Sequence, residues 1–432
     1  MPNIAAMWLD LSAFALEVAR AVVISSEFTR SSELFVPDSR RAWARLAVAV
    51  LIGSLGSVGM WSVVVALPAV QQDFGATRGT ASLAFTMVML GFGLGQVVTG
   101  KISDRYGIVT AIGLGISILG LGYIVAGMSW SIWPYILVHF AIGLSSAATF
   151  GPLMAEASHW FERYRGLAVA IAASGNYVGG AIWPSLVNRG MQTYGWRTTH
   201  IAVGIFTAVA MTLALFGLRL LMGAGGRRSH VNAPPPRLDL KLSANALTVI
   251  LGLASISCCV AMSMPQVHIV AYCSDLGYSV ARGAEMLSLM LGLGIISRVG
   301  SGFLADRIGG IPTLLIGSIA QGAALLFYLF FDGLTSLFLI SAMFGLFQGG
   351  IVPSYAIIVR ETMPASEAAT RVGMVILASV FGMSFGGWIS GVIFDATGSY
   401  AAAFTNGVVW NAVNVTIMVL LLLRARQRMA MA

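Results

Sequence analysis

The sequence predicts an all-α membrane protein with twelve transmembrane helices in two six-helix bundles. Hydrophobic residues make up 57% of the chain and charged residues only 10%, whereas a soluble domain carries about 25% charged residues. The chain also repeats itself, because Gly100-Lys-Ile-Ser-Asp104-Arg105-Tyr-Gly and Gly302-Phe-Leu-Ala-Asp306-Arg307-Ile-Gly lie 202 positions apart. A repeat of this length in an apolar chain is typical of two like-oriented helical bundles.

Each expected helix is an apolar run of the roughly 20 residues that cross a bilayer, and lipid requires such a run to be helical because no water bonds its backbone groups. The expected spans are 45–70, 79–101, 108–128, 132–158, 165–188, 198–221, 245–272, 283–304, 311–331, 334–358, 368–394 and 400–423.

These helices divide the chain into an N-terminal bundle (43–222) and a C-terminal bundle (245–424). The segment 223–244 contains three consecutive prolines and no apolar face, so it is expected to be an extended cytoplasmic linker. Residues 425–432 are expected to form a C-terminal tail. Residues 1–42 form an N-terminal tail, which fits either an amphipathic helix on the membrane or a tail without fixed structure.

The basic residues predict the orientation. If both termini are cytoplasmic, the tails and loops on that side hold 20 of the 25 Lys and Arg residues, and the opposite loops hold only Arg78, Arg189, Arg197 and Arg282. Because basic loops stay on the cytoplasmic side, we expect a multi-pass protein of the cell inner membrane with both termini cytoplasmic. The net charge of +8 follows from this topology. We therefore expect the lipid bilayer as a partner and no nucleic acid. We expect a monomer.

Several classes of function are not expected. No metal-ligand spacing and no nucleophile–base motif occurs in the chain, so we expect neither an enzyme nor a cofactor or metal site. Cys258, Cys259 and Cys273 fall on the seventh expected helix. Adjacent cysteines do not normally bridge each other, so these are expected to be buried thiols.

The repeated Gly-x-x-x-Asp-Arg-x-Gly motif, between the second and third helices and between the eighth and ninth, resembles the loop signature of the major facilitator superfamily. Within that superfamily the chain resembles a bacterial member of the monocarboxylate transporter group over residues 45–425. The motifs that carry this resemblance are Asp73-Phe-Gly-Ala-Thr-Arg78-Gly, His159-Trp-Phe-Glu-Arg-Tyr-Arg165-Gly and Asp275-Leu-Gly. The resemblance implies a secondary transporter that works by alternating access.

The repeated loops are candidate gating elements. Asp104 and Asp306 each end a helix at the expected cytoplasmic surface, where a carboxylate meets the positive N-terminus of a neighbouring helix. The resemblance implies that these residues latch the outward-facing state. The alternative is that they only set topology and turn geometry. The complete gating set is Asp104, Arg105, Asp306, Arg307, Gly100 and Gly302.

Arg298 is the single Lys or Arg inside the apolar core. It lies eight residues before Asp306, which is ~12 Å at 1.5 Å per residue, near the middle of a ~30 Å hydrocarbon layer. A guanidinium at this depth costs ~2.5–3.5 kcal/mol, and no acidic residue lies at a comparable depth. An anion site is the favoured interpretation because Arg binds a carboxylate bidentately. The alternative is a structural Arg bonded to helix-end carbonyls.

The resemblance implies the same role, because an Arg on helix 8 is the carboxylate anchor of the monocarboxylate group. Two residues of the animal proteins' proton relay are absent, since their places hold Gly294 and Ala69. His139 and His268 are the remaining titratable candidates for proton coupling, and each also fits a hydrogen-bonded core residue.

The other candidate substrate contacts are neutral. The repeat places Gln96 at the position equivalent to Arg298, and Tyr177, Asn176 and Gln348 are polar or aromatic residues on expected helices. Each of these three also fits ordinary packing.

The expected function is the secondary transport of a small organic anion, a monocarboxylate in particular, with protons as the default coupling ion. Two alternatives remain, a carrier for the efflux or uptake of a non-carboxylate solute, and a non-transporting membrane sensor of the same fold.

Overall fold

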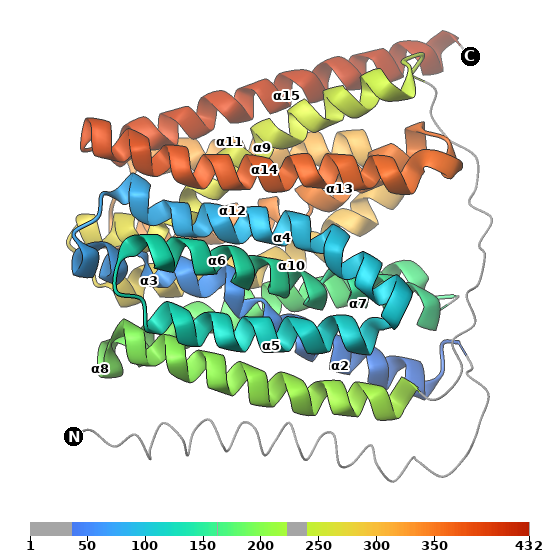
Figure 1. Cartoon of the computed structure of the whole chain (residues 1–432). Coiled ribbons are helices and arrows are strands. Elements are labelled where there is room, and N and C mark those ends of the chain that lie inside the picture. Colours follow the sequence, from blue (N-terminus) through green and yellow to red (C-terminus); the bar gives the residue numbers. More distant parts are fainter. Residues whose placement is uncertain (1–36, 162, 223–239, 432) are drawn as a thin grey trace.

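The structure is a computed structural model that describes residues 37–161, 163–222 and 240–431 (Figure 1). Within these ranges the chain forms helices and no strands, which confirms the all-α prediction. Most of the expected N-terminal tail and the linker residues 223–239 lie outside the described residues.

The helices of the N-terminal half are α2 (Arg40–Gly56), α3 (Val58–Phe74), α4 (Arg78–Tyr106), α5 (Ile108–Gly127), α6 (Ile132–Ser146), the 3-10 turn η2 (Ala147–Thr149), α7 (Gly151–Trp160) and α8 (Arg165–Met222). Those of the C-terminal half are α9 (Ala244–Asp275), α10 (Val280–Ile308), α11 (Gly310–Phe330), α12 (Leu334–Gln348), α13 (Ile351–Thr362), α14 (Ala365–Thr397) and α15 (Tyr400–Met431).

These helices make twelve membrane crossings. Eleven helical segments in the described residues are long and apolar enough to span a bilayer, and the longest, Leu167–Met222, has 56 residues. Inside it Gly195 has φ 78° and ψ 161°, which is a backbone conformation that a helix does not adopt. Gly195 therefore divides α8 into two crossings, and the predicted number of transmembrane helices is confirmed.

Three crossings are broken where the sequence analysis expected single helices. Ser57 separates α2 from α3, η2 separates α6 from α7, and Gly349 and Gly350 separate α12 from α13. Pro152 and Pro353 lie in the first turns of α7 and α13, where a proline has no backbone N–H to bond the preceding turn. The α6–α7 and α12–α13 crossings, which are equivalent in the two halves, are thus interrupted at similar places, whereas α9, the equivalent of the α2–α3 crossing, is continuous.

The two ends of the bundle hold different segments. We call the end with Arg40, Met222 and Ala244 the linker end, and the opposite end, where α4 begins, the Arg78 end. The last helix continues to Met431, beyond the expected 423, because apolar periodicity marks only its membrane-crossing part. Its Arg424 bonds the carbonyl of Leu240 at 2.8 Å, as Arg45 bonds the carbonyl of Leu221 at 2.9 Å in the other half.

The sequence repeat reappears in the helix packing. A Cβ atom at Gly143 of α6 would overlap the carbonyl of Val88 on α4, and a Cβ atom at Gly345 of α12 would overlap the carbonyl of Met290 on α10. Both contacts join backbone to backbone, and each pair is displaced by the repeat length. Such close approach is how helices associate in lipid, where packing replaces the hydrophobic effect.

We expect Gly143→Ala to lower stability by about 1–3 kcal/mol, since its methyl group meets rigid backbone and not a movable side chain. The measurement is the thermal unfolding midpoint of the purified protein in detergent. Gly373→Ala is the matched control, because a methyl group on this helical glycine would meet no described atom within 4 Å. An equal loss of stability in both variants would contradict the packing assignment.

Candidate substrate site and gates

The two halves of the molecule touch along two antiparallel helix pairs, α4 with α14 and α8 with α10. Figure 1 shows α4 beside α14. Thr86 of α4 donates to the carbonyl of Ser384 at 3.1 Å, and the hydroxyls of Ser185 on α8 and Ser288 on α10 are 3.1 Å apart. These contacts lie toward the Arg78 end, so the halves are joined there.

Arg298 lies at the α8–α10 contact. Its Nε donates to the carbonyl of Gly349 at 3.3 Å, and its Nη1 donates to the carbonyl of Ala173 in the other half at 3.2 Å. The residue four positions after Gly349 is Pro353, which has no N–H for a helical bond to that carbonyl. Arg298 therefore supplies a donor that the broken helix lacks.

The guanidinium of Arg298 keeps free bonding capacity. Among the described residues it contacts no carboxylate, and no hydrogen bond uses its Nη2. Nη2 is also not one of the buried polar atoms without a partner, so it reaches accessible space. The side chain thus points neither into lipid alone nor at a protein acid, and two of its nitrogens are held by carbonyls.

Tyr177 of α8 lies over this guanidinium, with the Arg298 Cζ atom 4.4 Å from the ring centroid. A Cβ atom at Gly294, one turn before Arg298, would lie 2.5 Å from Tyr177 Cε1. Glycine at 294 therefore leaves the space that the ring occupies. Gly294 thus gives room for an aromatic ring from the other half to lie over the guanidinium.

Gln96 occupies the repeat-equivalent place in the N-terminal half. Its amide lies against Gly151, at the break between η2 and α7, and its Nε2 is buried without a hydrogen-bond partner in the described part of the chain. The two halves thus present a neutral amide and a cation at equivalent helix breaks, as the repeat predicts.

The amides of Gln348 and Asn176 make no hydrogen bond to the guanidinium of Arg298 among the described residues. Gln348 is buried and accepts a hydrogen bond from Gln266 at 2.6 Å within the C-terminal half. Asn176 accepts a bond from Trp61 Nε1 at 3.2 Å within the N-terminal half. The hydrogen bonds of these amides therefore connect helices of one half and do not lead to Arg298.

His139 is completely buried among aromatic residues of the N-terminal half. Its Nδ1 lies 2.6 Å from the carbonyl of Tyr135, and its Nε2 has no partner among residues 37–161, 163–222 and 240–431. His200 bonds the carbonyl of Trp196 at 2.9 Å in the same cluster. The contacts of His139 thus stay inside this cluster, apart from Arg298 and from the interface between the halves.

The predicted gating residues are separated at the linker end. Asp104, Arg105, Asp306 and Arg307 are exposed, and none makes a hydrogen bond or ion pair within the described ranges. Gly100 and Gly302 face open space, since a Cβ atom on either would meet no described atom within 4 Å. The halves are therefore joined at the Arg78 end and parted here.

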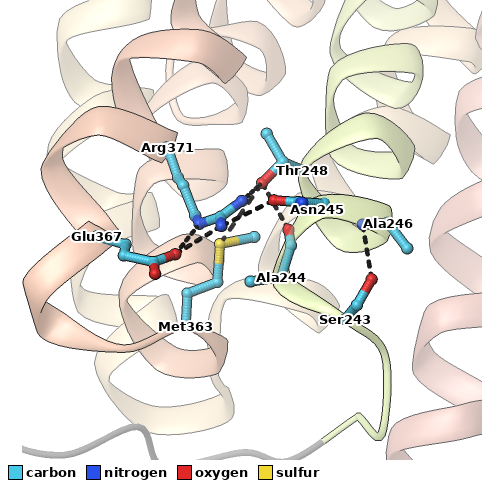
Figure 2. A network of polar contacts seen from close by, with 8 residues as sticks. All are labelled: Ser243, Ala244, Asn245, Ala246, Thr248, Met363, Glu367 and Arg371. Carbon is cyan, nitrogen blue, oxygen red and sulfur yellow. Dashed lines mark hydrogen bonds and ion pairs between the residues drawn. The ribbon is translucent and has the colours of Figure 1, made fainter.

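A polar network fixes the linker end of α14 to that of α9. Figure 2 shows the guanidinium of Arg371 between Glu367, which it meets at 2.5 Å, Thr248 at 2.8 Å and Asn245 at 3.0 Å. A cavity of about 460 Å³ adjoins these residues. Since every nitrogen of Arg371 already donates, this cation is a clamp between helices and a poor anion site.

The sequence analysis missed a network at the opposite end. Arg78, at the start of α4, bonds both carboxylate oxygens of Asp275 at 2.9 and 3.2 Å and the hydroxyl of Tyr400 at 2.6 Å. Asp395 of α14 accepts from the backbone N–H groups of Arg78 and Gly79 at 2.8 and 2.6 Å. We call Arg78, Asp275, Asp395 and Tyr400 the Arg78 network.

A signal for this network was present in the sequence, because Arg78 is one of only four basic residues expected on its side of the membrane. What the sequence does not give is which helix ends meet. Three elements of the C-terminal half converge on one arginine of the N-terminal half.

Known proteins resemble this chain over most of its length. Monocarboxylate transporter 13 of Rattus norvegicus is 24% identical over 379 residues, covering 85% of this chain and 86% of the relative. Agnestins efflux protein AgnL12 of Paecilomyces divaricatus is 24% identical over 316 residues, covering 72% and 71%.

Among solved structures, a bacterial homolog of the human lysosomal transporter Spinster, in an inward-facing and unoccupied conformation, superposes with a TM-score of 0.66. It is 15% identical, over 90% of this chain and 96% of that one. The nucleoside transporter NupG superposes with a TM-score of 0.69 at 12% identity, over 88% and 99%.

A family model described as Major Facilitator Superfamily matches residues 49–340 and 301–430. Together these matches cover both halves of the repeat. With its twelve crossings and its duplicated loop motif, the chain belongs to the major facilitator superfamily of transporters and is not an enzyme.

Proposed function

We propose that this protein is a secondary transporter of small organic anions of the monocarboxylate class, which works by alternating access with Arg298 as the carboxylate anchor. Its main support is the half-buried guanidinium of Arg298, which lies where the two halves meet and has no carboxylate partner among the described residues. An incoming carboxylate supplies the missing countercharge.

The carbonyl contacts of Arg298 fit this role. A carbonyl carries only a partial negative charge, so Gly349 and Ala173 orient the guanidinium without neutralising it. The Arg298 Cζ atom lies over the ring of Tyr177, so the ring meets the cation through its π-face. A bidentate carboxylate needs two parallel N–H groups from two neighbouring nitrogens, and Nη2, which no described residue uses, can supply one of them.

A carrier of a non-carboxylate solute is the second candidate. A relative named as an efflux protein is as similar to this chain as one named as a monocarboxylate transporter. The two carbonyl bonds also suit an arginine that only braces the break between α12 and α13.

The orientation belongs to the same proposal. The excess of basic residues at the linker end makes that end cytoplasmic, in the inner membrane, with both termini inside. The described conformation, joined at the Arg78 end, is then the inward-open state of a monomer. Protons are the proposed coupling ion.

We propose that the linker end is closed in the outward-open state. It closes when α4 and α14 continue toward that end the antiparallel pairing that they already make at the Arg78 end. Arg78 faces Asp395, Thr86 faces Ser384 and Gly93 faces Val380 in this antiparallel pair. Continued to the linker end, the register sets Asp104 and Arg105 opposite the first turn of α14, which holds Glu367. Asp104 then meets the positive N-terminus of α14, and Arg105 meets Glu367.

We expect Arg298→Lys to weaken carboxylate binding by about 10- to 100-fold, because hydrogen bonds to charged groups contribute about 1.5–3 kcal/mol and Lys lacks the fork. The measurement is ligand-dependent thermal stabilisation of the purified protein with monocarboxylates from acetate to hexanoate and with their hydroxy and oxo derivatives. Arg282→Lys on the same helix is the control, since Arg282 lies at the surface and pairs with the exposed Glu285.

Unchanged stabilisation by every carboxylate in Arg298→Lys would remove the anchor role. Loss of transport of a neutral solute in the same variant, measured in liposomes, would favour the second candidate.

The gate is tested by a double-mutant cycle with Arg105→Gln and Glu367→Gln. We expect each single variant to change the transport rate in liposomes several-fold and the two effects not to add, because both changes remove the proposed Arg105–Glu367 ion pair. The contact of Glu367 with Arg371 is weakened in the Glu367→Gln single variant and in the double variant alike, so it cancels in the cycle. The control cycle combines Glu367→Gln with Arg307→Gln, since Arg307 lies on the other helix pair. Additive effects in both cycles would show that Arg105 and Glu367 do not meet.

A further inference from the structure

The Arg78 network contacts a buried histidine that takes no part in the ion pair between Arg78 and Asp275. His268 of α9 is completely buried beside Tyr400, with its Nδ1 3.2 Å from the tyrosine hydroxyl and its Nε2 2.8 Å from the carbonyl of Gly387 on α14. The hydroxyl of Tyr400 in turn accepts a hydrogen bond from Nη1 of Arg78 at 2.6 Å. An unbroken chain of contacts therefore runs from the imidazole to the arginine that joins the halves.

The direction of each bond follows from its partner. The carbonyl of Gly387 only accepts, so Nε2 of His268 carries a proton and donates. Arg78 only donates, so the oxygen of Tyr400 accepts from it and the tyrosine proton is left to point at Nδ1 of His268. Nδ1 must then accept, and the closed network fits a neutral ring with every polar atom of the ring bonded.

A second ring proton breaks this arrangement. It would place an N–H against the hydroxyl of Tyr400, whose own proton would lose its acceptor, and it would add a positive charge next to Arg78. The other groups that face this place are Asp275 and Tyr272 on α9, Asp395 on α14 and Tyr400 on α15. Both carboxylates are already engaged by Arg78 and its backbone.

We propose that His268 is a proton-binding site that controls the contact between the halves at the Arg78 end: the neutral ring holds this end closed, and the protonated ring holds it open. The inference rests on the alternating access of the proposed function and is independent of a carboxylate cargo. Because His268 is buried while the end is closed, its proton comes from the solution that the open state admits. A low pH in the solution on the side of the Arg78 end therefore keeps the carrier in the conformation that is open to that side.

The test is the distance between spin labels at Gln72→Cys and Ala396→Cys, two exposed positions of the two halves at the Arg78 end. It is measured in liposomes without substrate, between about pH 5 and pH 8, where an ordinary histidine titrates. In the otherwise unchanged protein we expect the ratio of long to short distances to rise on acidification, by up to about tenfold per pH unit for one proton.

His268→Gln is expected to give short distances at every pH, because an amide keeps a donor and an acceptor but takes no proton. Tyr400→Phe keeps the ring packing and removes the link to Arg78, so its pH response should be reduced. The matched control is His200→Gln. His200 is also buried and contacts a carbonyl and a tyrosine hydroxyl, but its bonds to the described residues include no arginine.

A full pH response in His268→Gln would overturn the assignment, as would no response in the unchanged protein. If the response were instead lost only in Asp275→Asn, the proton site would be that carboxylate. Since no ligand is present in these measurements, a failed carboxylate screen leaves their interpretation unaffected.

Discussion

The close approach of small residues along α4–α14 and α8–α10 is the contact on which the rest of the structure depends. Gly79 and Gly391 let the backbones of the two halves meet at the Arg78 end, and Gly180 leaves room for the side chain of Leu291 from the other half. The same four helices continue to the linker end. Because a helix bends little, contact between the halves at the Arg78 end keeps them apart at the linker end. Among the described residues, the bond of Arg298 to Ala173 is the hydrogen bond of the α8–α10 pair nearest the linker end, and the same side chain also bonds Gly349 of its own half.

The duplicated sequence gives the two halves the same arrangement of helices, but at a few equivalent positions the halves carry side chains of different charge. Equivalent crossings break at Pro152 and Pro353, yet the side chain beside the first break is the amide of Gln96 and beside the second is the guanidinium of Arg298. Under the proposed function, the result is a binding site with one strong anion contact, supplied by the C-terminal half.

The fold could be predicted from the sequence because apolar length and basic loops are local properties, and the repeat tied the halves together. Arg298 also stood out in the sequence, since a lone cation among apolar residues needs no structure to be noticed. Its bond to Gly349 and the Arg78 network could not be predicted, because they depend on which helix ends meet. Gln348 and Asn176 make their hydrogen bonds within single halves, a difference that composition does not reveal.

Pro353 has a consequence for the electrical behaviour of the carrier. By leaving the carbonyl of Gly349 without a backbone donor, it provides an acceptor for the positively charged side chain of Arg298 even when no ligand is bound. Under the proposed function, the empty carrier is then charged at this place, whereas the carrier loaded with a single anion alone is neutral there. A membrane voltage, which acts on charge within the bilayer, therefore spares the loaded step when the anion binds alone, and acts on the empty and the loaded carrier alike when a coupled proton binds with it.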